Sequence, residues 1–257
     1  MGLTVCADTR IASGDPLTDS GQKLFRVPVE VTLFGLEGRI VTFPSVGFAF
    51  AGNTLMAQSC CAIASTALSN LSAAEADEPI SPEAIAEVFA KAAEYVSRER
   101  RFLSPQRLTG FQAIVFGWDT AAGEPFIFEI EIEEDDGALS ASAERKYLAA
   151  GGLIYFGSGA KFVTEKIEEL VARKAHGVHP YQLVQAAIAD VSLRSVGGSM
   201  QFGTAGPDGV RLRPTMRVST TGMAEISILG CDIHRLMGES GLFPGANAMT
   251  LTEGLGF

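Results

Sequence analysis

Basic side chains are scarce in this sequence, which has 20 Lys and Arg against 30 Asp and Glu and a formal net charge of −10. Binding to a phosphate backbone needs a basic face, so this charge disfavours nucleic acid as a partner. Apolar runs long enough to span a bilayer are also lacking, and the start has no basic region followed by an apolar block. We therefore expect neither a membrane partner nor a secretory signal.

Cysteine and histidine are few as well, with four and three residues respectively. Cys60 and Cys61 are adjacent on a predicted helix and point apart, and no C-x-x-C or Cys/His ligand spacing occurs. This pattern predicts free, buried thiols in a reducing cytoplasm and no metal or cofactor. A Ser-His-Asp hydrolase is disfavoured because no G-x-S-x-G motif is present.

The acidic run "EIEIEEDDG" at 129–137 alternates apolar and acidic residues and ends in Asp-Gly. Alternation of this kind is typical of a strand with one solvated face that enters a hairpin turn. A metal site would need converging oxygen ligands, and only proximity in the sequence favours one here.

Blocks of strands and pairs of helices alternate along the chain. Strands are predicted at 2–8, 23–34, 39–43, 46–51, 111–117, 125–133, 146–157 and 224–229, with a hairpin over 197–212. Helices are predicted at 53–71, 81–102, 161–174 and 180–194. Consecutive strands favour antiparallel sheets, and two blocks of helices favour two sheets packed face to face with helices outside. We expect a single α+β domain over residues 1–237, followed by a Gly-rich tail over 238–257.

The order of motifs resembles that of the β-type subunits of the proteasome, which are N-terminal-nucleophile hydrolases. The motifs are "ADTR" at 7–10, "QKLFRV" at 22–27, "FAFAGN" at 48–53, "AIVFGWD" at 113–119, "YFGSGA" at 155–160 and "VGGS" at 196–199. The resemblance covers most of the chain, from about Gly2 to Ile233. It implies the four-layer αββα sandwich of that family.

The resemblance also implies a site. In the family, the hydroxyl of the first residue is the nucleophile and its own α-amine accepts the proton. By position, Lys23 matches the lysine that lowers the pKa of the hydroxyl, Asp8 the acid that holds this lysine, and Gly52 the oxyanion glycine. Ser158 matches a serine that supports the amine, although a helix N-cap explains it equally well. Arg10 is expected to be structural, paired with a neighbouring carboxylate.

Two departures from the family pattern stand out. The nucleophile would lie upstream of Gly2 by about eight residues, one strand and a tight turn. Thr4 and Cys6 cannot replace it, because they lie on the same strand as Asp8 and a strand rises about 3.3 Å per residue. The polypeptide as written is therefore expected to be inactive.

The second departure concerns the residues that steady the amine in the family. An Asp and a Ser hydroxyl are expected there, but alignment on the Gly197-Gly198 pair gives Leu193 and Val196. A shifted alignment would recruit Asp190, Ser192 or Ser195, and the sequence does not decide among these three.

The resemblance implies a threonine-type peptidase that acts on peptides or unfolded proteins and is assembled in a homo-oligomeric ring, with an ATPase as a candidate partner. Two alternatives stay open. One is a non-catalytic ring scaffold of the same fold, and the other is a hydrolase of small-molecule amides with the same nucleophile.

Overall fold

The computed structural model describes residues 2–13, 15–34, 39–74, 80–103, 110–135, 138–173, 179–218, 224–229 and 231–232. The predicted tail over 238–257 and two of the histidines, His176 and His234, lie outside these residues. In chain order the elements are β1 (Leu3–Asp8), β2 (Ile11–Ser13), β3 (Asp15–Thr18), β4 (Leu24–Leu33), β5 (Ile40–Gly52), α1 (Thr54–Leu68), β6 (Leu71–Ala73), α2 (Pro82–Leu103), β7 (Phe111–Asp119), β8 (Glu124–Asp135), β9 (Ala138–Arg145), α3 (Ala160–Ala172), α4 (Pro180–Ala189), β10 (Met200–Gly206), β11 (Gly209–Arg213), β12 (Thr215–Val218), β13 (Ala224–Ile228) and β14 (Cys231–Asp232).

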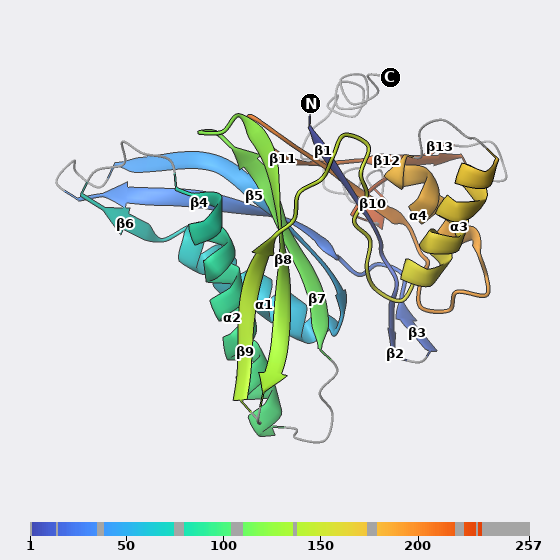
Figure 1. The fold of residues 1–257 in the computed structure, drawn as a ribbon, viewed down its shortest axis with the longest axis horizontal. Coiled ribbons are helices and arrows are strands. Elements are labelled where there is room, and N and C mark those ends of the chain that lie inside the picture. Colours follow the sequence, from blue (N-terminus) through green and yellow to red (C-terminus); the bar gives the residue numbers. More distant parts are fainter. Residues whose placement is uncertain are drawn as a thin grey trace.

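The largest sheet has six strands in the order β6-β4-β5-β7-β8-β9, antiparallel except for the β4–β6 pair. α1 and α2 pack together and cover one of its faces (Figure 1). Phe48 of β5 stacks on Phe89 of α2, with ring centroids 5.3 Å apart. Both helices begin where the sequence predicts: Asn53 caps α1 by accepting from Met56 N at 3.2 Å, and Ser81 accepts from Ala84 N at 3.1 Å before α2.

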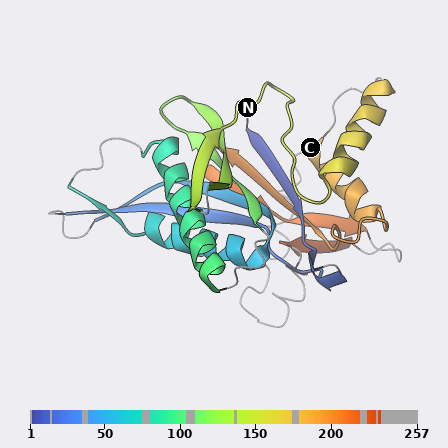
Figure 2. The same ribbon diagram turned by 60° about the horizontal axis from the view of Figure 1, so that its bottom comes forward.

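A second core lies between this sheet and a three-stranded sheet of order β1-β10-β11. It is built from apolar side chains of both sheets: Val5, Leu24, Ala49, Ile114, Phe116, Ile127, Ala205 and Val210. α4 contacts β1 and β10, and α3 contacts α4. In Figure 2, α3 and α4 lie on the side of the molecule opposite α1 and α2. The predicted mixed α+β class is confirmed.

Most predicted elements are present, with local differences. The two strands expected at 39–43 and 46–51 form the single strand β5, whose pairing with β4 shifts register between Val27 and Val29. Pro44 lies at this irregularity, where proline's missing N–H is tolerated. The helix expected over 180–194 ends at Ala189, and Asp190 is its C-cap.

The strand predicted at 146–157 is wrong. These residues contain no strand, because the chain turns at 149–152, where Gly152 N donates to Ala149 O at 2.8 Å and Gly151 has φ +81°. β9 pairs with β8 instead, over Ala138–Arg145. The sequence of β9, ALSASAER, is rich in small residues of weak strand preference, which explains why it was missed.

Candidate functional site

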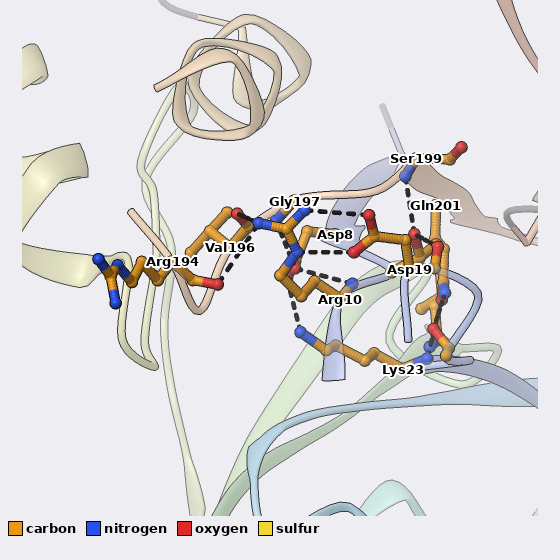
Figure 3. Close-up of polar contacts among 12 residues, drawn as sticks. Asp8, Arg10, Asp19, Lys23, Arg194, Val196, Gly197, Ser199 and Gln201 are labelled. Atoms are coloured by element: carbon orange, nitrogen blue, oxygen red, sulfur yellow. Dashed lines mark hydrogen bonds and ion pairs between the residues drawn. The ribbon is translucent and has the colours of Figure 1, made fainter. Parts of the chain in front are cut away.

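Lys23 and Asp8, which lie 15 positions apart in the sequence, form an ion pair. Lys23 Nζ lies 2.7 Å from Asp8 Oδ1, and the two side chains are only 13% and 14% exposed. Asp8 is the last residue of β1, in the small sheet, and Lys23 immediately precedes β4 of the large sheet. The pair therefore joins the end of a strand of the small sheet to the start of a strand of the large sheet. Figure 3 shows the contact between the two side chains. The sequence-predicted partnership of these two residues is present in the structure.

The second oxygen of Asp8 is also occupied. Oδ2 accepts hydrogen bonds from the backbone N–H groups of Arg10 and Gly197, each at 3.1 Å. A carboxylate held by one ammonium and two peptide N–H groups is fixed in position. Asp8 Oδ1 is the partner of Lys23 Nζ among the residues described, and the ammonium has further N–H groups to offer a ligand.

Arg10 joins three segments. Its Nε and one terminal nitrogen donate to both oxygens of Asp19 at 2.6 and 3.0 Å, and its other terminal nitrogen donates to the carbonyls of Val196 and Arg194. Asp19 raises the pKa of Arg10 by this hydrogen bond, and Arg10 lowers the pKa of Asp19 in turn. Arg10 thus pairs with a neighbouring carboxylate, as expected of a structural residue.

The loop over 190–199 is bound to β1 by this network. The carbonyl of Gly197 accepts from the N–H groups of Thr9 and Arg10, and a Cβ on Gly197 would lie 2.3 Å from the Arg10 guanidinium carbon. Thr9, which is fully buried, accepts from Ser199 N at 2.7 Å through its hydroxyl. A Cβ at position 197 would displace the Arg10 side chain, and Gly198 has φ +73° with an added Cβ only 2.6 Å from Asp19 O, so both positions of the glycine pair in "VGGS" favour glycine.

Gln201 is a site residue that the sequence did not reveal. Its side chain is fully buried, its Oε1 accepts from the N–H groups of Lys23 and Leu24 at 3.0 and 2.8 Å, and its Nε2 donates to Gly21 O at 2.7 Å. The only signal in the sequence was one amide in a strand of mostly apolar and small residues, "MQFGTAG". Asp19 was missed too, because an acid between Thr and Ser in a turn region is unremarkable.

Gly52 ends β5 in a backbone conformation that favours glycine. Its φ is +99°, and a Cβ there would lie 2.8 Å from Gly110 O and 3.0 Å from Phe111 Cα. It lies two residues beyond Phe50, whose N–H donates to Lys23 O at 3.2 Å. In β5, Gly52 is therefore close in sequence to Phe50, which is hydrogen-bonded to the backbone of Lys23.

Ser158 is not brought into this network by the described contacts. It is exposed, its hydroxyl makes no hydrogen bond among the described residues, and it does not cap α3, whose N-cap is Gly159. The neighbouring Gly157, at φ +90°, packs against Ala51, so the loop that carries Ser158 passes the end of β5. A role for Ser158 stays a prediction.

The three polar candidates near the end of α4 are separate from the ion pair in the described contacts. Asp190 Oδ1 accepts from Ser192 N at 2.8 Å, and hydrogen bonding with Ser192 lowers the pKa of Asp190. Val196, which occupies a position expected to be polar, contributes its carbonyl to Arg10. Within the residues described, the side chain of Ser195 makes no hydrogen bond to Asp8 or Lys23.

Other chemistry finds little support. Burial raises the pKa of the Cys6 thiol to about 12, so a thiolate nucleophile is not available there near neutral pH. No group of three or more potential metal ligands occurs in the part of the chain that the structure describes. Among those same residues, no helix has the length and apolar character needed to cross a membrane.

Comparison with known proteins gives a limited result. No family model matches the sequence, and no curated protein matches it. Similar solved structures include the helical assembly of the Anbu complex from Pseudomonas aeruginosa, with 17% identity over 95% of each chain and a TM-score of 0.48. They also include Anbu (ancestral beta-subunit) from Yersinia bercovieri, with 18% identity over 95% of this chain and 94% of that one and a TM-score of 0.42.

These neighbours correct the family named from the sequence. Anbu proteins are proteasome-like but form a family distinct from the proteasome β-type subunits, so the assignment to the β-type subunits is wrong. The motifs that suggested this family, such as "ADTR" and "QKLFRV", place an Asp and a Lys near the ends of two strands. Such a placement is not specific to one family.

Proposed function

We propose that this chain provides the lysine–aspartate part of a hydrolase site that cleaves peptide amide bonds with an N-terminal hydroxyl nucleophile. The observation that carries the proposal is the ion pair of Lys23 with Asp8, 2.7 Å long and largely withdrawn from solvent. An ammonium held in this way lowers the pKa of a nearby hydroxyl and stabilises negative charge that develops on oxygen.

The edge of β1 supports a location for the nucleophile. Within the described residues β1 pairs with β10 alone, so its other edge is available to a further strand. A preceding strand joined to β1 by a tight turn would run antiparallel to it and would open opposite the far end of β1. That end is Asp8, beside Lys23. An N-terminal threonine on such a strand would therefore present its hydroxyl to the ammonium.

The proposed reaction balances without a cofactor. The hydroxyl oxygen attacks the amide carbon while its proton passes to the α-amine of the same residue. The C–N bond then breaks, and the departing amine takes the proton from the α-ammonium group of the N-terminal residue. An ester now joins the substrate acyl group to the protein. Water hydrolyses the ester by the same proton route. Gly52, with its constrained peptide at the end of β5, is proposed to donate an N–H to the oxyanion.

The proposal includes the fold and assembly expected from the sequence. The packing of α1 and α2 on the large sheet, and of α4 on the small one, supports a four-layer αββα sandwich within one domain over residues 1–237. A homo-oligomeric ring and an ATPase partner stay predictions. Light scattering of the purified protein decides the first of these.

The test supplies the nucleophile. A strand of about eight residues is placed before Gly2, and a removable fusion partner is cleaved to expose an N-terminal Thr or, as the control, Ala. Fluorogenic peptide amides and small-molecule amides are then offered to both proteins. We expect hydrolysis of peptide amides by the Thr protein alone. If amide exchange shows the added strand paired with β1 and no substrate is cleaved, the proposal is wrong and the scaffold alternative is favoured.

A further inference from the structure

Gln201 lies between β1, which ends at Asp8, and the segment before β4 that contains Lys23. In β10 it pairs in register with Ala7, and its neighbour Met200 pairs with Asp8. The backbone of Gln201 is thus fixed to β1 one residue before the carboxylate. Its side chain leaves the small sheet and reaches the segment that leads into β4 of the large sheet, as Figure 3 shows.

The amide of Gln201 holds that segment from both sides. The oxygen accepts from two consecutive peptide N–H groups, those of Lys23 and Leu24, and the nitrogen donates to the carbonyl of Gly21. All three bonds are between 2.7 and 3.0 Å, and the side chain is fully buried. Loss of the amide would leave three backbone groups unpaired in the interior, where water does not replace the partner.

We infer that Gln201 is a positioning residue for the proposed site: it fixes the backbone of Lys23 relative to β1 so that the ammonium meets Asp8. The inference rests on the proposed function in taking Lys23 as the functional amine. It adds a residue that touches neither the nucleophile nor the substrate. Phe50 N holds Lys23 O to β5 at 3.2 Å, but this bond lies within the large sheet and does not register Lys23 against Asp8.

The chain offers a matched control in Ser45. This residue is also buried, and it also joins the two sheets, because its hydroxyl accepts from Val210 N of β11 at 3.1 Å. It further accepts from Arg26 Nε at 3.0 Å. Ser45→Ala therefore removes a buried bond between the same sheets without touching the backbone of Lys23.

The test measures the reactivity of the Lys23 amine directly, without requiring hydrolysis. Reductive methylation of the folded protein, read by peptide mass spectrometry, gives the rate for Lys23 relative to Lys161, which is 89% exposed. In Gln201→Met we expect this ratio to rise by about fivefold or more, the population change that follows loss of an anchoring interaction. Ser45→Ala should leave the ratio unchanged.

A second variant guards against misfolding. Gln201→Glu keeps the acceptor for Lys23 N and Leu24 N, so its ratio should lie between those of the wild type and Gln201→Met. If Gln201→Met does not fold, the comparison is made between Gln201→Glu and Ser45→Ala. An unchanged Lys23 ratio in the Gln201 variants, or an equal rise in Ser45→Ala, would overturn the inference.

Hydrolysis is a separate readout. In the protein given an N-terminal Thr, Gln201→Met should lower kcat and leave KM unchanged, since it moves a group that acts on the nucleophile. If no variant hydrolyses any substrate while the methylation ratios follow the expected pattern, the proposed function is wrong and the positioning of Lys23 by Gln201 stands.

Discussion

Gly197 N donates to Asp8 Oδ2 at 3.1 Å, across 189 positions of sequence. This bond fixes the loop after α4 to the end of β1. The carbonyl of Gly197 also accepts hydrogen bonds from the N–H groups of Thr9 and Arg10. The acid of the proposed site is thus held by the backbone of a distant loop as well as by Lys23. Substitutions in this loop should therefore alter the position of Asp8 in the ion pair.

Gly197→Ala is expected to destabilise the fold. The added Cβ would lie 2.3 Å from the Arg10 guanidinium carbon, so the guanidinium or the loop must move. Overpacking of this kind costs about 1–3 kcal/mol, which urea unfolding would measure. Gly206→Ala is the control, because nothing lies within 4 Å of its added Cβ. Equal stability of the two variants would show that a Cβ at position 197 makes no steric clash with Arg10.

A double-mutant cycle on Lys23 and Asp8 tests the ion pair itself. Lys23→Met or Asp8→Asn should each destabilise the protein by about 3 kcal/mol, because each leaves a largely buried partner without its counterpart. The double variant should lose less than the sum, with a coupling of about 1–3 kcal/mol in urea unfolding. Strict additivity would mean that the two side chains do not interact in solution.

The pair of Arg10 and Asp19 should make stability depend on pH in the acid range. Arg10 lowers the pKa of Asp19 in the folded protein, so this carboxylate stabilises the fold above its ordinary pKa of about 3.9. That contribution is lost as the pH falls through the lowered value. Asp19→Asn should therefore be less stable than the wild type at pH 7, and the difference should vanish in strong acid.

Asp208→Asn is the control for this pH dependence, since within the described part of the chain Asp208 pairs only with the exposed Arg211. At pH 7 the stability of Asp208→Asn should differ from that of the wild type by less than the stability of Asp19→Asn does. A stability difference between Asp19→Asn and the wild type that persists unchanged in strong acid would contradict the stabilising role of the Asp19 carboxylate.

The thiols should differ sharply in reactivity. Burial raises the pKa values of Cys6, Cys60 and Cys61 to about 12, whereas Cys231 is exposed. Reaction of the native protein with a disulfide reagent at pH 8 should therefore modify one thiol quickly and the other three only after denaturation. Cys231→Ser should abolish the fast phase. A fast phase that survives this substitution would show that one of the other three thiols reacts in the folded protein.

The pairing of Lys23 with Asp8 was expected because the order of motifs resembles that of the proteasome β-type subunits, whereas the roles of Gly52 and Ser158 stay predictions. The strand pattern itself predicts only that one apolar strand ends at Asp8 and that another starts at Lys23. The hydrogen-bonding partners did not follow, since they depend on tertiary register. Nothing in "MQFGTAG" indicates that Gln201 meets the backbone of Lys23, 178 positions away. Similarly, β9 was missed because the pairing of its small residues is decided by β8 and not by their own preference.

The central claim is that Lys23 activates a hydroxyl placed beside it. The most direct measurement is kcat for a peptide amide in the protein with an N-terminal Thr, compared with the same protein carrying Lys23→Met. We predict that kcat falls by about 10²-fold or more, the usual effect of removing a group that stabilises charge in the transition state. Equal kcat values in the two proteins, with hydrolysis still dependent on the Thr, would contradict the account.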